Sequence, residues 1–281
     1  MIRAGIVNTA LLPVYAERDV CGIRTDELLY GMMVKITDTK EKDRYKIETD
    51  YQYAGLVLSK ELVCEKSLVS QWKTGKKLVV IKRFCDVMGQ PTVKSRVLMN
   101  LYRGSVLLDK GRAAQPGWQC VGLVDGRDGF VRQEYIKDYP VMDIPETEFR
   151  NALTDTAYSY LGTPYRWGGK STIGIDCSGF TFMVYALNGV YIHRDSAWLP
   201  PGPVKKIADC QKKPGDLLYF PGHIALYLGN GEYIHATAKD GAGVTINSLK
   251  RGTNGYRADL EHSYLYAGSI FGSYASFHEE R

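Results

Sequence analysis

One cysteine stands where a loop sequence changes into a helical sequence. Cys177 lies within GGKSTIGIDCSGFTFMVYALNG, after a run of Gly, Lys, Ser and Thr and before apolar residues at helical spacing. These apolar residues are Phe180, Met183, Val184 and Leu187, and Gly189 can end the helix. A thiol at a helix N-terminus faces unpaired backbone N–H groups and the positive end of the helix dipole, which favour the thiolate. The position therefore predicts a nucleophile, although a single cysteine is more often a buried structural residue.

A thiolate that attacks an amide needs a proton donor for the departing amine, and two histidines are candidates. His223 and His235 lie on two predicted strands, HIALYL and EYIHA, which flank the sequence GNG. A three-residue loop over GNG pairs Leu228 with Glu232 and Ala225 with His235, which places both histidines on one face, whereas a two-residue Asn-Gly turn would separate them. We predict the three-residue loop, with His223 as the general base and His235 as the partner that fixes its tautomer.

The elements that position these residues belong to a domain that begins near residue 142. After DYPVMDIPETE the apolar residues Phe149, Leu153, Ala157 and Tyr160 recur at helical spacing. GTPYRWGG then predicts a loop before the cysteine helix, and DLLYF predicts a strand before the two that carry the histidines.

The first half of the chain contains an internal repeat. YAGLVLSKELV and RDGFVRQEYIK match so that Gly55 corresponds to Gly129, 74 residues later, and Gly31 corresponds to Gly104, 73 residues later. Both copies consist of short Val, Ile and Tyr runs bounded by turns, which is typical of small antiparallel barrels. The predicted domains are two barrels over residues 1–68 and 74–140 and a third domain over residues 142–281.

Composition excludes several other classes of protein. The chain has 281 residues and a net charge of +5, from 36 basic and 31 acidic residues that are scattered, so we expect no nucleic-acid partner. The six cysteines form no C-x-x-C pair, so we expect no metal and no cofactor. No apolar run approaches the length of a membrane span. The first residues favour a strand over a signal peptide, and reduced thiols suit a cytoplasmic location; a secreted or wall-associated protein is the alternative if a signal has been removed.

Four ordered motifs carry a family resemblance. GTPYRWGG, DCSGF, PGDLLYF and HIALYLGNGEYIHA resemble the NlpC/p60 cysteine peptidases over roughly residues 143–271. The resemblance implies an α+β chain with a papain-like catalytic domain, and the Gly-aromatic-Val ending of each repeat is similar to bacterial SH3-like barrels. Two such barrels before the catalytic domain resemble the subgroup of γ-D-glutamyl-L-diamino acid endopeptidases.

The resemblance also implies roles for residues near Cys177. Tyr165 lies in the loop that the family folds over its active site, where its hydroxyl would donate to the developing oxyanion; a tyrosine that only packs in the loop is the alternative. Asp176 and Ser178 would lie near the substrate backbone, and Trp167 would form a wall of the cleft.

A second group of residues would recognise the end of the substrate. Subgroup members that act on free peptides carry an Asp-Ser pair at the position of Asp195 and Ser196, where Asp binds an amine and Ser binds a carboxylate. A surface pair between Arg194 and Asp195 is the alternative. Tyr53 matches the tyrosine that the subgroup brings to the site from its first barrel.

These residues predict a cysteine peptidase that hydrolyses the γ-D-Glu to diamino acid bond of murein peptides. The expected partner is a peptide such as L-Ala-γ-D-Glu-diaminopimelate with a free amino terminus, which fits peptide recycling. An amidase or acyltransferase on the same fold, or a cell-wall binding protein anchored by its barrels, are alternatives, because fold does not fix substrate. The sequence leaves open whether diaminopimelate or lysine is the third residue, and it leaves open the oligomeric state.

Overall fold

The structure of the chain is a computed structural model that describes residues 3–16, 22–39, 43–140, 143–197, 202–239 and 243–271. It divides into two compact units, Met1–Pro140 and Val141–Arg281. Residues 142, 198–201, 240–242 and 272–281 of the predicted third domain lie outside the described ranges. Within those ranges, no helix is both long enough and apolar enough to cross a membrane.

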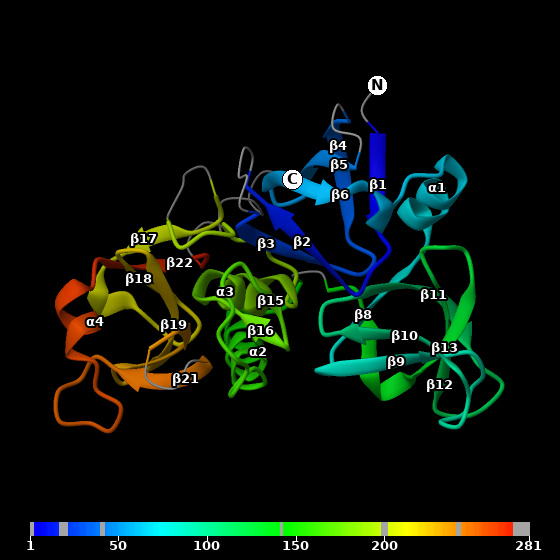
Figure 1. The fold of residues 1–281 in the computed structure, drawn as a ribbon. Helices are drawn as coiled ribbons and strands as arrows, with labels where there is room; N and C mark the ends of the chain where they lie inside the picture. Colours follow the sequence, from blue (N-terminus) through cyan, green and yellow to red (C-terminus); the bar gives the residue numbers. More distant parts are fainter. Residues whose placement is uncertain are drawn as a thin grey trace, which may run out of the picture. The chain divides into compact units, whose positions relative to one another are not determined.

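The first unit contains two seven-stranded antiparallel sheets with the same topology (Figure 1). The first has the order β3-β2-β6-β5-β4-β1-β7 and the second the order β10-β9-β13-β12-β11-β8-β14, so each strand matches the one seven places later. The first sheet consists of β1 (Arg3–Val7), β2 (Leu11–Tyr15), β3 (Arg24–Leu29), β4 (Met33–Asp38), β5 (Arg44–Thr49), β6 (Ala54–Leu58) and β7 (Leu62–Val63). The second consists of β8 (Lys77–Val80), β9 (Phe84–Met88), β10 (Val97–Tyr102), β11 (Val106–Arg112), β12 (Trp118–Gly122), β13 (Asp128–Arg132) and β14 (Ile136–Asp138). The 3₁₀ turns η1 (Ser59–Glu61) and η2 (Gln133–Tyr135) lead into the last strand of each sheet.

Matching glycines confirm the internal repeat. Gly55 in β6 and Gly129 in β13 occupy the same position in the two sheets. A Cβ atom at Gly55 would lie 2.4 Å from Cγ1 of Val14, and one at Gly129 would lie 2.5 Å from Cγ1 of Val87. The same close approach of a neighbouring strand therefore requires glycine in both copies.

A helix joins the two sheets and includes residues 69–73, which lie between the two predicted barrels. The helix α1 (Lys66–Thr74) buries Trp72, whose Nε1–H donates to the carbonyl of Gly31 at 3.0 Å. The hydroxyl of Tyr30 accepts a hydrogen bond from the backbone N–H of Val124 at 2.7 Å. One core cluster contains residues of the first sheet and α1 (Ile6, Tyr30, Val69, Trp72) together with residues of the second sheet (Val80, Leu107, Val131). The two sheets therefore share a core.

The second unit combines a six-stranded antiparallel sheet, of order β17-β22-β18-β19-β20-β21, with α-helices and a short β-hairpin. Its elements are α2 (Glu146–Tyr158), the hairpin β15 (Lys170–Ser171) and β16 (Gly174–Ile175), α3 (Cys177–Ala186), β17 (Lys205–Ile207), η3 (Asp209–Gln211), β18 (Leu217–Phe220), β19 (His223–Gly229), β20 (Glu232–Thr237), β21 (Gly243–Ser248), α4 (Ala258–Ser263) and β22 (Tyr266–Ser269). As predicted, α2 buries the face that carries Phe149, Leu153 and Ala157.

The cysteine helix α3 is buried on every side, whereas the apolar spacing predicted an amphipathic helix. All residues from Cys177 to Tyr185 are buried, because α2, β15, β19 and β20 contact the helix around its circumference. A helix enclosed in this way needs no polar face. It ends where the sequence predicted, before Gly189 at φ 88°.

The turn between β19 and β20 has two residues, so the predicted three-residue loop is wrong. Asn230 and Gly231 both have positive φ, 52° and 86°, as a tight hairpin turn requires. Gly229 pairs with Glu232 next to the turn, and the register then shifts. Leu228 is left as an extra residue on β19, and Leu226 lies opposite Ile234. This bulge restores the register that the longer loop would have given, and the sequence therefore placed both histidines on the correct face.

Candidate active site

Cys177 is the first residue of α3, and Asp176 caps the helix. The Asp176 carboxylate accepts a hydrogen bond from the backbone N–H of Gly179 at 2.6 Å. The Cys177 side chain is 7% exposed, and its sulfur lies close to the backbone N–H groups of Ser178 and Ile224. Because Ile224 follows His223 in β19, these contacts place the thiol against the start of that strand.

The thiol form of Cys177 is favoured at neutral pH. Burial, and then the negative charge of Asp176, raise the pKa of Cys177 to about 11, while the N–H groups of Ile224 and Ser178 and the charge of Arg194 lower it. The helix N-terminus therefore acts in the direction that the sequence predicted. Its effect is smaller than that of burial.

The two histidines form a chain of hydrogen bonds that continues to a third residue. Nε2 of His223 lies 2.7 Å from Nδ1 of His235, and Nε2 of His235 lies 2.8 Å from Oδ1 of Asn247. The three residues come from neighbouring strands, β19, β20 and β21, and lie on the same face of the sheet.

Asn247 fixes the tautomers of both histidines. Its Nδ2 group donates to the carbonyl of Gly255 at 3.0 Å, so its Oδ1 faces His235 as an acceptor. His235 must then carry its proton on Nε2 and accept on Nδ1, which assigns the proton of the first hydrogen bond to Nε2 of His223. The remaining nitrogen of His223, Nδ1, is left with a lone pair and can accept a proton.

Burial keeps both imidazoles neutral. It lowers the pKa of His223 to about 3, with a smaller contribution from His235, and it lowers the pKa of His235 to about 4 against the opposing effect of the Asn247 hydrogen bond. The free site therefore holds a neutral thiol and a neutral base.

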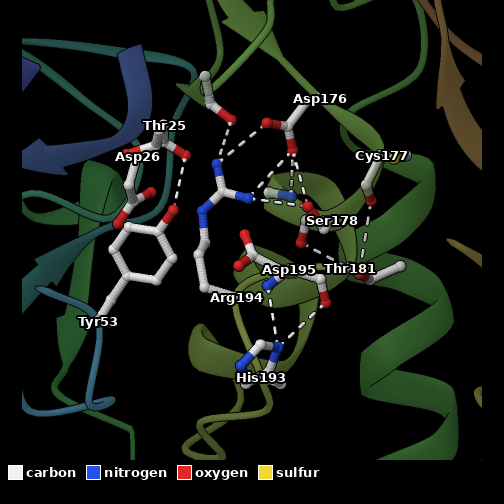
Figure 2. A network of polar contacts seen from close by, with 12 residues as sticks. Thr25, Asp26, Tyr53, Asp176, Cys177, Ser178, Thr181, His193, Arg194 and Asp195 are labelled. Carbon is white, nitrogen blue, oxygen red and sulfur yellow. Dashed lines mark hydrogen bonds and ion pairs between the residues drawn. The ribbon is translucent and has the colours of Figure 1, made fainter. Parts of the chain in front are cut away.

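Arg194 connects the residues on either side of the cysteine. Its guanidinium donates to both carboxylate oxygens of Asp176 at 3.1 Å and to Oγ of Ser178 at 2.9 Å (Figure 2). Ser178 in turn donates to Asp176 at 3.2 Å, and the Arg194 side chain is 1% exposed. Arg194 therefore forms a buried ion pair with Asp176.

Tyr165 lies within electrostatic reach of the cysteine. Its backbone bridges to Ile175, two residues before Cys177. Burial, and then the charges of Cys177 and Asp176, raise the pKa of the half-buried Tyr165 to about 12, so its hydroxyl keeps its proton and can donate a hydrogen bond.

The other predicted substrate residues lie in more open positions. Trp167 is 65% exposed. Asp195 has an exposed side chain and Ser196 is half-buried, and the backbone N–H of Asp195 donates to Nδ1 of His193 at 3.2 Å. Tyr53 belongs to the first unit, where its hydroxyl donates to the carbonyl of Thr25 at 3.4 Å (Figure 2). The roles of these four residues in substrate binding stay predictions.

Neither Asn247 nor the buried position of Arg194 was predicted from the sequence. The spacing in the sequence could have indicated Asn247. It lies on β21, the strand that follows the hairpin of the two histidines, and it follows His235 by the same twelve residues that separate His235 from His223. The sequence gives no such indication for Arg194, because its partners Asp176 and Ser178 lie eighteen and sixteen residues before it. Among the residues that the structure describes, no group of three His, Cys, Asp or Glu side chains is arranged to hold a metal ion.

The chain is similar to several known proteins. The profile of the NlpC/P60 family matches residues 162–259. A dipeptidyl-peptidase 6 from Lysinibacillus sphaericus is 38% identical over 271 residues, which cover 95% of this chain and 99% of that protein. A γ-D-glutamyl-L-lysine dipeptidyl-peptidase from Bacillus subtilis is 32% identical over 148 residues, 49% of this chain and 47% of the relative. A crystal structure of an NlpC/P60 family protein from Bacillus cereus shares the fold, with a TM-score of 0.77 at 20% identity over 94% of this chain and 98% of that one. The chain belongs to the NlpC/P60 family of cysteine peptidases.

Proposed function

We propose that this protein hydrolyses the bond between γ-D-Glu and the L-diamino acid in murein peptides whose amino terminus is free. The observation that carries the chemistry is the Cys177 thiol at the start of α3, beside the strand whose His223 begins the His223–His235–Asn247 chain. A thiol beside an oriented neutral imidazole is suited to acyl transfer through a covalent intermediate.

In this mechanism, proton transfer accompanies attack because both groups start neutral. Nδ1 of His223 takes the proton as the Cys177 sulfur bonds to the carbonyl carbon, and His235 stabilises the imidazolium that forms. The C–N bond then breaks, the imidazolium protonates the departing amine, and water hydrolyses the thioester to release the acid and regenerate the thiol. The Tyr165 hydroxyl and the Cys177 backbone N–H are the proposed donors to the oxyanion.

The substrate class rests on the relatives. The Bacillus subtilis relative is named a γ-D-glutamyl-L-lysine dipeptidyl-peptidase, and the relative that matches nearly the whole chain is also named a dipeptidyl-peptidase. Release of a dipeptide requires recognition of a free amino terminus. We assign the substrate ammonium to the exposed Asp195 carboxylate, a substrate carboxylate to Ser196, and closure of the site to Tyr53.

The test compares L-Ala-γ-D-Glu-diaminopimelate and its lysine analogue with their N-acetylated forms. Loss of one partner of a desolvated ion pair costs about 2 kcal/mol or more, so acetylation should lower kcat/KM about thirtyfold or more. Asp195→Asn should lose most of this discrimination, whereas the matched control Asp155→Asn, at an exposed position of α2, should keep it. Mass spectrometry of the products identifies the bond that is cut. Equal rates on both peptides, or full discrimination by Asp195→Asn, would contradict the free-terminus assignment.

A further inference from the structure

A second pocket lies entirely within the first unit. Its volume is about 820 Å³, and it opens between one face of α1 and the strands β1 and β4. Lys66, Val69, Ser70 and Lys73 line it from the helix, and their spacing of three, four and seven residues places them on one face. A volume of this size is typical of sites for small molecules or short peptides.

The rim of this pocket is strongly basic. Four exposed cations line it, namely Arg3, Lys35, Lys66 and Lys73, against one exposed carboxylate, Asp50. Lys35 pairs with Glu48 at 3.0 Å. Among the described residues, no carboxylate lies within 4.0 Å of the charged groups of Arg3, Lys66 or Lys73. Concentrated charge of one sign around a concave site attracts ligands of the opposite sign.

The floor of the pocket is apolar. Val34 is 2% exposed and Val69 is 9% exposed, and they line the pocket together with Met33, Ala4 and the sulfur-bearing side chain of Cys64. A ligand that fills the pocket must therefore present aliphatic surface to this floor and carboxylates to the basic rim, and an amino group would face Asp50.

We propose that this pocket binds a short acidic peptide that carries a free amino group, two carboxylates and a small aliphatic side chain. The dipeptide L-Ala-γ-D-Glu has these groups, with an alanine methyl for the apolar floor. Its identification as the product of this same protein rests on the proposed function. The binding itself does not, because the pocket is a separate site from the cysteine.

Cys64 gives a local measurement of occupancy, because it is a free thiol in the pocket wall. We would alkylate the full-length Cys177→Ala variant with iodoacetamide and follow each cysteine by peptide mass spectrometry. At a dipeptide concentration ten times its Kd, alkylation of Cys64 should slow about tenfold. Cys120, which is also free and half-buried but lies in β12 of the second sheet, serves as the internal control and should react at an unchanged rate.

Two variants separate specific binding from general attraction to a basic protein. Lys66→Gln with Lys73→Gln should weaken protection of Cys64 about tenfold or more, which corresponds to about 1.4 kcal/mol. Lys82→Gln with Lys94→Gln removes the same charge from exposed positions outside the pocket and should leave the protection unchanged. The diamide of the dipeptide, which lacks both carboxylates, should not protect.

The inference is overturned if the dipeptide does not protect Cys64, if the diamide protects equally, or if the two double variants behave alike. These outcomes are independent of hydrolysis, since the variant lacks the nucleophile. If the protein does not hydrolyse the proposed substrate but the dipeptide still protects Cys64, the pocket assignment is kept. If the protein hydrolyses the substrate but the dipeptide does not protect Cys64, the catalytic proposal is kept.

Discussion

Cys177 and His223 are both neutral in the free protein, since burial raises the pKa of the thiol to about 11 and lowers the pKa of the imidazole to about 3. In the proposed mechanism, Cys177 therefore stays in the less reactive thiol form until its proton moves to His223. A protonated thiol is also less open to oxidation and alkylation than a thiolate. At the scale of single residues, reactivity depends on the hydrogen-bond chain that receives the proton.

Substitution of either Cys177 or His223 should remove nearly all of the activity. Cys177→Ala should abolish hydrolysis with the fold intact, and His223→Ala should be nearly as severe, because groups that act as one unit have effects that do not add. His235→Gln should be milder, since it removes the orienting partner and keeps the base. Measurements of kcat/KM on the free tripeptide check this order. Turnover by Cys177→Ala near the wild-type level, or a greater loss in His235→Gln than in His223→Ala, would contradict the assigned roles.

The buried histidines should make the protein less stable in mild acid. In the unfolded chain each binds a proton near pH 6.5, whereas the folded pKa values are about 3 and 4. The stabilisation that the two neutral histidines give the folded state is therefore fully present above about pH 6.5. As the pH falls toward 4, the free energy of unfolding decreases by up to about 1.4 kcal/mol per pH unit for each histidine.

Urea unfolding between pH 7 and pH 4.5 measures this slope. The double variant His223→Gln, His235→Gln should show a shallower dependence than the wild type. The matched control His262→Gln, whose side chain is 67% exposed, should follow the wild type. Parallel curves for the wild type and the double variant would show that carboxylates alone cause the acid loss.

Arg194 should matter for stability and for catalysis in different degrees. Arg194→Met leaves the Asp176 carboxylate buried without its cation, which costs about 3–5 kcal/mol. Arg194→Lys keeps the charge but cannot donate to both carboxylate oxygens, so it should recover much of the Tm and less of the kcat. The control Arg251→Met removes an arginine whose side chain is 70% exposed, and should change neither. Unchanged Tm in Arg194→Met would contradict the structural role of the buried pair.

At the scale of elements, the hairpin of β19 and β20 shows what a sequence can and cannot predict. The choice of an odd-numbered loop over GNG placed both histidines on one face, because the loop length sets the register of a hairpin. The sequence pattern could not separate a three-residue loop from an Asn-Gly turn followed by a bulge at Leu228, since both give that register.

Other features depended on tertiary contacts that no local pattern encodes. The position of Cys177 at the start of a helix was readable from its neighbours, but the pKa of its thiol was not, because burial by α2, β19 and β20 decides it. The repeat with Gly55 and Gly129 was readable, but α1 was not. Its sequence KSLVSQWKT has few apolar residues, and Trp72 gains its place only by contact with Gly31 in the first sheet.

At the scale of the first unit, the shared core predicts joint unfolding of the two sheets. Trp72→Ala should cost about 3–5 kcal/mol, as large core truncations do, and should destabilise both sheets. Two probes report on them separately, namely alkylation of Cys64 beside the first sheet and of the buried Cys85 in the second. Both should become reactive at the same urea concentration in the wild type and at the same lower one in the variant.

Limited proteolysis gives an independent check. The segment from residue 64 to residue 76 should resist cleavage at Lys66 and Lys73, because α1 holds it in place. Early cleavage there, together with separate unfolding of Cys64 and Cys85, would mean that the sheets are independent barrels joined by a linker.

The identical topology of the two sheets also bears on how the chain reaches its fold. Because β6 and β13 have the same place in their sheets and lie under equivalent valines, exchanging them would preserve the backbone hydrogen-bond pattern. Side-chain packing and the short connections to β5 and β12 distinguish the correct arrangement from the exchanged one. On the ribosome the first sheet is complete before the strands of the second emerge, so the order of synthesis favours correct pairing. A chain that refolds from denaturant presents all fourteen strands at once and has no such protection against trapped, strand-exchanged forms.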